Sequence, residues 1–402
     1  MSIFTEWTIA TKFLREGKAQ SLLILVGIGL GVAVIVFLTA LINGLQSNTI
    51  ERTLGTQAHI TVQPADERNL VVAPPDGTTQ LILDDKRAQR LRSINNWQQV
   101  RDVLDQQAHI TAVSPLISGP AFARRGDALK SVALMGIDPD RYRRIVKLDE
   151  AMVEGAFRLG AGNVLIGSQL ATDLGLRVGD KLRLDGGQQR EAVVNVVGIF
   201  ELGVRELDAR YVYLDMKQAQ ALVDLPGAAT IIDLTVDDIF DAQKMAQSVA
   251  RLTGLKAESW METNSQLMNA LRAQRLSTQM ISVFVALSVA LGIASVLSVS
   301  VVQRTREIGI LRAMGTTRQR ILRVFLMQGA LLGLAGSLPG GLAGYGMLAA
   351  FNTLGPKLFW IPIDTGLLLS AIGLATFTGV VAAALPARRA ASLDPVEAIR
   401  HG

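Results

Sequence analysis

Residues 21–43 read SLLILVGIGLGVAVIVFLTALIN, and no side chain in this stretch carries a charge. As an α-helix the stretch is about 35 Å long, enough to cross the roughly 30 Å hydrocarbon core of a bilayer. A cleaved signal peptide has a shorter apolar region and a small-residue cleavage site, and LTALING at 38–44 supplies no good site of that kind. We therefore predict a first transmembrane span over 21–43.

Three more uncharged stretches stand near the other end of the chain. We predict spans at 276–303, 324–350 and 365–387, with a kink or loosening at the Pro-Gly-Gly of 339–341. The chain is 49% hydrophobic and has 37 glycines beside only 5% aromatic residues, a composition typical of closely packed membrane helices. The predicted fold class is a membrane protein with four transmembrane α-helices.

The basic residues decide the orientation of these spans. They gather at 1–20, 304–323 and 388–402, and the middle segment holds six arginines but a single acid. By the positive-inside rule these segments, and with them both termini, face the cytoplasm, so that 44–274 lies outside. The same rule explains the net charge of +5, and we expect a membrane but no nucleic acid as a partner.

The outside region, 44–274, reads as a mixed α/β domain. Two β-α-β units, of which the first is HITVQP, WQQVRDVLDQ and HITAVSPLI, suggest a ferredoxin-like layer. Residues 164–200 hold a strand, a helix and a hairpin that turns tightly at 185–187, which indicates a second, β-rich subdomain. The polar stretch 66–96 is expected to be a loop or mobile insert.

Two helices are expected beside the membrane. Residues 1–20 place Ile3, Trp7 and Ala10 on one face, which predicts an interfacial amphipathic helix with Trp7 at headgroup depth. From Glu262 a polar sequence enters the second span without Gly or Pro. We expect one continuous helix there, which would join the outside domain rigidly to the membrane.

The sequence lacks the motifs of catalysis. It has no G-x-x-x-x-G-K-[ST] loop for ATP phosphates and no cysteine, and its histidines, His59, His109 and His401, have no metal-ligand spacing. No ionisable residue lies within a span, which argues against ion-coupled transport. We expect no catalytic residue, no metal and no cofactor bound by this chain.

The basic segment 304–323 predicts a helical hairpin that projects into the cytoplasm. Gly315 is expected to cap a first helix, and Thr316 with Gln319 matches a capping box that begins a second, short helix. Positive charge alone is explained by a connection that merely fixes topology. The capped geometry is more elaborate than a tether needs, and it favours a docking element for a cytoplasmic partner.

Two stretches carry a resemblance to a known family. REIGILRAMGTTRQRILRVFLMQGALLGLAG at 306–336 and PARRAASLDPVEAIRHG at 386–402 resemble the permease domain shared by FtsX, MacB and the Lol permeases, here 275–402. VGIGLGVAVIVFLTALINGLQSNTIERTLGTQAHITV at 26–62 is similar to the lipoprotein-releasing permeases of the LolC and LolE type.

This resemblance implies a permease subunit of a mechanotransmission ABC transporter in the bacterial inner membrane. A separate ATPase, in two copies, would bind ATP and magnesium, and a second permease subunit would complete a homo- or heterodimer. The segment 315–323 would be the coupling helix that sits on the ATPase. The implied ATPase-coupling residues are Glu307, Arg312, Gly315, Thr316, Thr317, Arg318, Gln319, Arg320 and Ile321.

For the substrate, the resemblance implies a lipoprotein that enters sideways between the first and second spans. The residues that could line this route are Ala33, Val36, Phe37, Leu41, Met280 and Phe284. Ordinary helix or lipid packing explains any one of them equally well. The tight turn at 185–187 departs from the extended hairpin with which one Lol type grips its carrier.

Three functions therefore stay open. The first, and the one we predict, is release of lipoproteins from the outer leaflet of the inner membrane, with or without a periplasmic carrier. The second is MacB-like export of small molecules or peptides through a periplasmic adaptor. The third is FtsX-like signalling that controls a cell-wall hydrolase.

Overall fold

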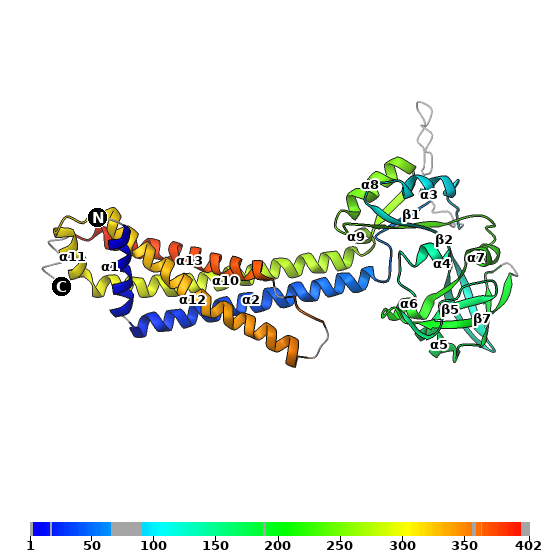
Figure 1. Ribbon diagram of the computed structural model, residues 1–402, viewed down its shortest axis with the longest axis horizontal. Coiled ribbons are helices and arrows are strands. Elements are labelled where there is room, and N and C mark those ends of the chain that lie inside the picture. The colour runs from blue at the N-terminus through cyan, green and yellow to red at the C-terminus, as the bar shows by residue number, and fades with distance from the viewer. Residues whose placement is uncertain are drawn as a thin grey trace, which may run out of the picture. The chain divides into compact units, whose positions relative to one another are not determined.

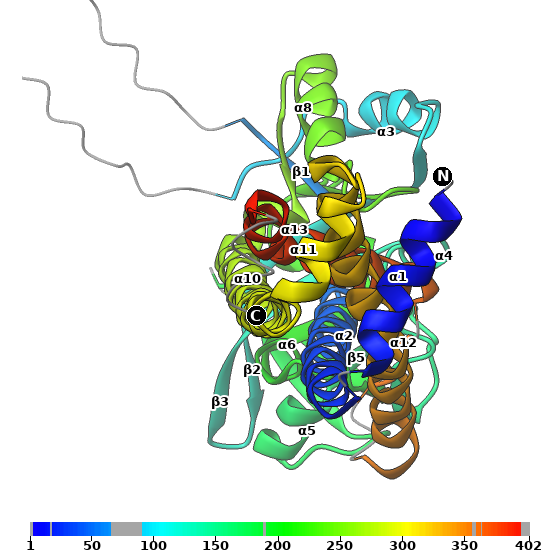
Figure 2. The ribbon, with the colours of Figure 1, turned by 90° about the vertical axis from the view of Figure 1, so that its left-hand side faces the viewer.

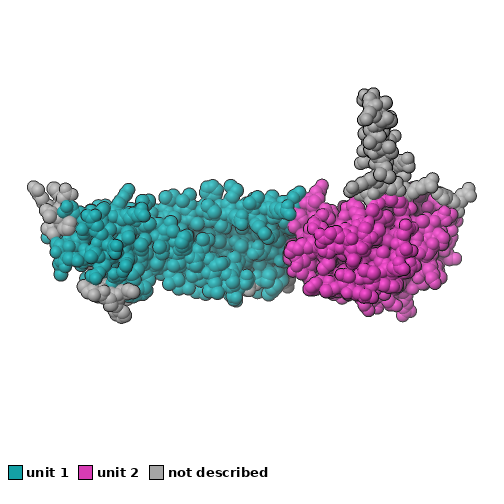
Figure 3. Space-filling model, turned by 90° about the horizontal axis from the view of Figure 1, so that it is seen from above, with its two compact units in different colours: residues 1–49, 269–402 teal, residues 50–268 magenta. Residues whose placement is uncertain are grey.

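The computed structural model describes residues 3–16, 18–65, 91–187, 190–355, 359–362 and 364–394. The chain divides into two compact units, one formed by residues 1–49 and 269–402 and the other by residues 50–268 (Figure 3). Up to residue 90, the expected insert at 66–96 lies outside the described residues.

Every secondary-structure element among the described residues of the first unit is a helix (Figure 1). Its helices are α1 (Ile3–Glu16), α2 (Lys18–Leu54), α10 (Ser265–Gln303), α11 (Thr305–Ala313), α12 (Arg318–Leu354) and α13 (Thr365–Ser392). Four of them, α2, α10, α12 and α13, are long and apolar enough to cross a membrane. The prediction of four transmembrane helices is confirmed, with the large domain inserted between the first two.

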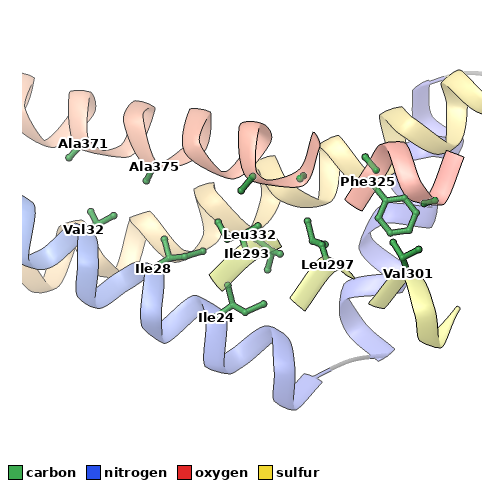
Figure 4. Close-up of a cluster of buried hydrophobic side chains, with 14 of the residues drawn as sticks. Ile24, Ile28, Val32, Ile293, Leu297, Val301, Phe325, Leu332, Ala371 and Ala375 are labelled. Atoms are coloured by element: carbon green, nitrogen blue, oxygen red, sulfur yellow. The ribbon is translucent and has the colours of Figure 1, made fainter. Parts of the chain in front are cut away.

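Small residues let the membrane helices approach closely. A side chain at Gly340 of α12 would collide with the backbone of Gly29 in α2, and one at Gly329 would collide with the backbone of Gly379 in α13. Figure 4 shows larger side chains such as Ile28 and Leu332 filling the space between these contacts. Backbone-to-backbone packing of this kind is how membrane helices gain attraction without a hydrophobic driving force.

The predicted loosening of the third span is wrong, whereas a kink at Pro339 stays a prediction. Helix α12 runs unbroken from Arg318 to Leu354, with Pro339 inside it. Membrane helices tolerate an internal proline because neighbouring helices and Ser or Thr side chains compensate for the missing backbone hydrogen bond. Pro339 leaves the Ala335 carbonyl without its usual helical donor, and next to it the Ser337 hydroxyl donates to the Leu334 carbonyl at 3.0 Å.

The second unit contains one ten-stranded sheet. Its strands are β1 (Ile60–Gln63), β2 (Ile110–Arg125), β3 (Ala128–Ile137), β4 (Met152–Gly155), β5 (Asn163–Gly167), β6 (Lys181–Asp185), β7 (Glu191–Phe200), β8 (Tyr211–Asp215), β9 (Ile231–Val236) and β10 (Lys256–Ser259). The order is β10-β1-β9-β2-β3-β8-β5-β7-β4, and β6 pairs with β2 and β7.

Two groups of strands within this sheet match the predicted subdomains. Strands β10, β1, β9 and β2 pair antiparallel in the order expected of a ferredoxin-like βαββαβ unit, with α3 (Trp97–Asp105) and α8 (Ala242–Thr253) as its helices. Strands β3 to β8 form the β-rich part, with the short helices α4 (Pro139–Tyr142), α5 (Ser168–Leu174), α6 (Arg205–Arg210) and α7 (Met216–Leu222). The long strand β2 belongs to both parts.

The continuous polar helix expected from Glu262 is interrupted. A capping box between Ser259 and Glu262 begins helix α9 (Trp260–Thr263), and Asn264 then leaves helical geometry before α10 begins. The buried indole of Trp260 donates to the Ile239 carbonyl at 2.8 Å. Anchoring of Trp260 in the sheet core fixes the chain direction here, and α10 starts afresh one residue after Asn264.

Candidate functional site

The turn between α11 and α12 has the geometry of a helix C-cap. Gly315 has a φ of 91°, its N–H donates to the Arg312 carbonyl at 3.0 Å, and the Thr316 N–H donates to the Leu311 carbonyl at 3.1 Å. This pair of hydrogen bonds is the Schellman motif, which needs a left-handed residue and so favours glycine. The predicted capping role of Gly315 is confirmed.

The predicted capping box is wrong. The N-cap of α12 is Thr317, one residue later than expected, and its side chain makes no capping hydrogen bond. Three residues after this cap stands Arg320, which has no acceptor to complete a box. The short second helix is the first turn of the long helix α12, so the tip is continuous with a membrane span.

The structure divides the nine predicted coupling residues by exposure. Five of them are exposed: Glu307, Gly315, Thr317, Arg318 and Gln319. Met314, which directly precedes Gly315, is 80% exposed. Residues 314–319, here called the tip, therefore offer a small surface with one apolar and one basic side chain. Sequence reasoning missed Met314, because a single methionine at the end of a helix gives no distinct signal.

Two of the other predicted residues face inward. Ile321 is only 4% exposed and packs in the helical core with Phe325. Arg312 points at the end of α13, where its Nη1 donates to the carbonyls of Ala391 and Leu393 at 2.9 and 2.7 Å. The side chain of Arg312 is therefore directed at the end of α13 and is not part of the exposed surface of the tip.

A further arginine was not singled out by the sequence. Arg304 is the only residue between α10 and α11, with φ −110° and ψ 16°, and it is 9% exposed. Its Nη2 donates to the Phe13 carbonyl at 3.0 Å, and its Cζ lies 4.4 Å from the centre of the Phe13 ring. The Glu307 carboxylate lies 3.5 Å from Nη1 of the same side chain.

The residues predicted to line a substrate route do not gather on one surface. Ala33 and Val36 of α2 are 4% and 3% exposed and lie against Gly344 of α12. Met280 and Phe284 of α10 are 60% and 62% exposed. The set thus divides between a packed core and an open helix face.

The histidines show no metal-site geometry. Within the described ranges, no three His, Asp or Glu side chains lie close enough to hold a metal ion. Burial lowers the pKa of His59, whereas the carboxylate of Asp237, 2.7 Å from Nδ1, raises the pKa of the exposed His109. His401 lies outside the described residues.

Two family models match this chain. A model of the FtsX-like permease C-terminal family matches residues 279–395, and a model of the MacB-like periplasmic core domain matches residues 21–252. The lipoprotein-releasing system transmembrane protein LolC of Xylella fastidiosa is 25% identical, over 98% of each chain. The corresponding LolE of Haemophilus influenzae is 24% identical, over 93% of this chain and 92% of its own.

The chain also matches relatives with other names, and for one of them only part of the relative is covered. The macrolide export ATP-binding/permease protein MacB of Agrobacterium fabrum is 27% identical over 95% of this chain, but only 58% of its own. Among solved structures, the periplasmic region of MacB from Actinobacillus actinomycetemcomitans aligns with a TM-score of 0.35 at 15% identity, over 55% of this chain and 95% of that one. The FtsX-like match includes the whole of α11, the tip and α12.

Proposed function

Because this chain belongs to the family of ABC transporter permeases that join a MacB-like periplasmic core domain to an FtsX-like C-terminal domain, we propose that it is the membrane subunit of a lipoprotein-releasing transporter. The observation that carries this proposal is the alignment with LolC over 98% of both chains. The relative MacB, whose name includes an ATP-binding part, is covered over 58% of its length.

In this proposal the energy comes from ABC ATPase subunits on separate chains, two per transporter, which hold ATP and magnesium. The tip, residues 314–319, is the docking surface for the ATPase. It is exposed, fixed by the Gly315 cap, and joined without a break to α12. Met314 supplies the apolar contact and Arg318 the charge.

The same proposal gives the long helices a mechanical role. Helices α2 and α10 each cross the boundary between the two compact units, and α10 ends one residue before α11. Movement of the ATPase at the tip would pass through α11 into α10 and reach the periplasmic unit. The orientation that follows has both termini in the cytoplasm and residues 50–268 outside the bacterial inner membrane.

The lipidated end of the substrate would approach the exposed side of α10. Met280 and Phe284 lie there together with Leu287 and Leu291, all more than half exposed. An acyl chain can lie against such a face without displacing packed side chains. The buried Ala33 and Val36 would then stabilise α2 rather than touch the substrate.

A second candidate function is export through a periplasmic adaptor. The observation that favours it is the short connection between β6 and β7, where the Gly187 N–H donates to Asp185 Oδ1 at 2.8 Å and Gly186 bonds to Arg190. A tight hairpin offers little surface with which to grip a soluble lipoprotein carrier.

Native mass spectrometry of the chain, purified gently from its own membranes, tests these functions. We expect two permease and two ATPase chains with a bound triacylated lipoprotein. An ATPase with a periplasmic adaptor and no lipoprotein would favour export instead. A chain that binds no ATPase under any nucleotide condition would overturn both proposals.

A further inference from the structure

Helix α1 is packed into the membrane unit rather than lying loosely on the lipid surface. Helix α1 lies beside α12 (Figures 1 and 2). Ala10 is fully buried and Phe13 is 9% exposed, and both lie against Val324 of α12. Trp7, on another side of the helix, is 48% exposed. One face of α1 therefore belongs to the protein core, and the other is free to meet headgroups.

The C-terminal end of α1 is held by Arg304. The last four carbonyls of a helix have no partner within it and form the negative end of the helix dipole. The Phe13 carbonyl is one of these four in α1, and it accepts the hydrogen bond from Arg304. The guanidinium also lies over the Phe13 ring, where a desolvated cation–π contact is strongest.

Arg312 makes the corresponding contact with α13. This helix ends at Ser392, and Arg312 donates to the carbonyls on either side of that residue, Ala391 and Leu393. Helix α11 thus has an arginine at each end, and each arginine caps the C-terminus of a different helix. Two such contacts from a helix of nine residues leave α11 little freedom to move alone.

A cavity lies between α1, α11 and the start of α12, near the contacts of Arg304. It measures about 50 Å³ and is bounded by Phe13 of α1, Ile308 and Leu311 of α11, and Thr316 and Arg320 beside the tip. Apolar packing between α1 and α11 is therefore incomplete at this point. Arg304 adds a hydrogen bond and a ring contact to Phe13 beside this gap.

We propose that Arg304 and Arg312 are positioning residues that make α1, α11 and the end of α13 move as one body when the tip is pushed. This inference rests on the proposed docking of an ATPase at the tip. It extends the coupling element from one short helix to three, and it assigns the amphipathic N-terminal helix a mechanical role. Substitution of either arginine should loosen the attached helix before it affects the fold of the spans.

Hydrogen exchange of the full chain in lipid nanodiscs tests the attachment without any ATPase. We expect Arg304→Lys to increase amide exchange in residues 3–16, because lysine lacks the planar fork that reaches the Phe13 carbonyl and Glu307 together. Arg312→Lys should increase exchange only at the end of α13. Arg306→Lys, on the exposed side of α11, is the matched control and should change neither region.

A second substitution covers the case in which lysine does not fold in this buried site. Arg304→Met keeps the length of the side chain and removes the charge, so that it can pack in a position that is 9% exposed. It should also increase exchange in residues 3–16. Unchanged exchange in both Arg304 variants would overturn the proposal.

Coupling is measured on the complete transporter in proteoliposomes. We expect lipoprotein released per ATP hydrolysed to fall about fivefold in Arg304→Lys, at the low end of the range for linked sites, with the ATPase still bound. A purely structural role would lower the yield of protein and leave this ratio unchanged, which would refute the proposal. If the parent chain binds no ATPase, the proposed function fails, and the exchange experiment still decides on the attachment.

Discussion

The close contact between α2 and α12 makes a sharp prediction for Gly340→Ala. A Cβ at this position would lie 2.7 Å from the Cα of Gly29 and 2.9 Å from its carbonyl carbon, with the carbonyl oxygen closer still. Every one of these atoms belongs to the backbone. No side chain can rotate away, so the two helices must separate.

The expected magnitude is the difference between two opposing effects. Overpacking in a well-packed core costs about 1–3 kcal/mol. Alanine in place of glycine in the middle of a helix recovers about 0.5–1 kcal/mol of conformational entropy. We therefore expect Gly340→Ala to lose about 1 kcal/mol of stability, within a range of about 0–2.5 kcal/mol.

Gly346 in the same helix is the matched control. No atom lies within 4 Å of a Cβ built at this position. Gly346→Ala should therefore show only the gain in helix propensity and become slightly more stable. Gly29→Ala should fall between the two, because its nearest neighbour is the Gly336 carbonyl oxygen at 3.3 Å.

The free energy of unfolding would be measured for all three variants in mixed micelles, with helix content followed by circular dichroism. The difference between Gly340→Ala and Gly346→Ala removes errors common to both. If Gly340→Ala is as stable as Gly346→Ala, the backbones of α2 and α12 are not in contact at Gly29, and the packing scheme is wrong.

Three further predictions concern the tip and the periplasmic unit. Gly315→Pro cannot donate to the Arg312 carbonyl or adopt a φ of 91°, so we expect lost coupling of ATP hydrolysis to release in a chain that still inserts, measured in proteoliposomes. Met314→Glu should weaken ATPase binding by about 1 kcal/mol or more, measured by titration in nanodiscs, and leave thermal stability unchanged. Burial raises the pKa of Asp233 from 3.8 to about 7, so the folded unit favours the protonated acid. The stability of the periplasmic unit should therefore fall as the pH rises from about 4 to about 7 and level off above pH 7. Asp233→Asn should remove this pH dependence in thermal unfolding scans.

Much of the fold could be predicted because its signals are local. A span is recognised within one charge-free window, and all four predicted spans lie inside long helices. The ferredoxin-like layer was also predictable, since strand and helix periods alternate along the chain. The union of both subdomains into one sheet was not predictable. It depends on β2 extending over Ile110–Arg125 and pairing with β3, β6 and β9 at once.

The errors at the tip have a related cause. Thr316 and Gln319 have the spacing of a capping box, but the Schellman turn at Gly315 already uses the Thr316 N–H. The next helix must therefore start one residue later, at Thr317. The competition between two capping motifs is settled by backbone geometry, which the residue types alone do not contain.

The roles of Arg304 and Arg312 were hidden for another reason. Arginines in a cytoplasmic segment are fully explained by topology. What sets these two apart is their acceptors, which lie 291 residues away for Arg304 and 79 and 81 residues away for Arg312. A single sequence gives no signal for a hydrogen bond to a distant backbone carbonyl.

The membrane helices differ in how firmly they are held, and this difference determines which one can transmit movement. Half of the apolar stretch of α12 is buried, against 11% of that of α10. Helix α12 meets its neighbours through backbone contacts at glycines, whereas α10 meets Gly31 of α2 through the side chains of Val285 and Val289. Side-chain contacts can slide, but interlocked backbones cannot. A push on α11 should therefore displace α10 relative to α2, along the side-chain contacts of Val285 and Val289.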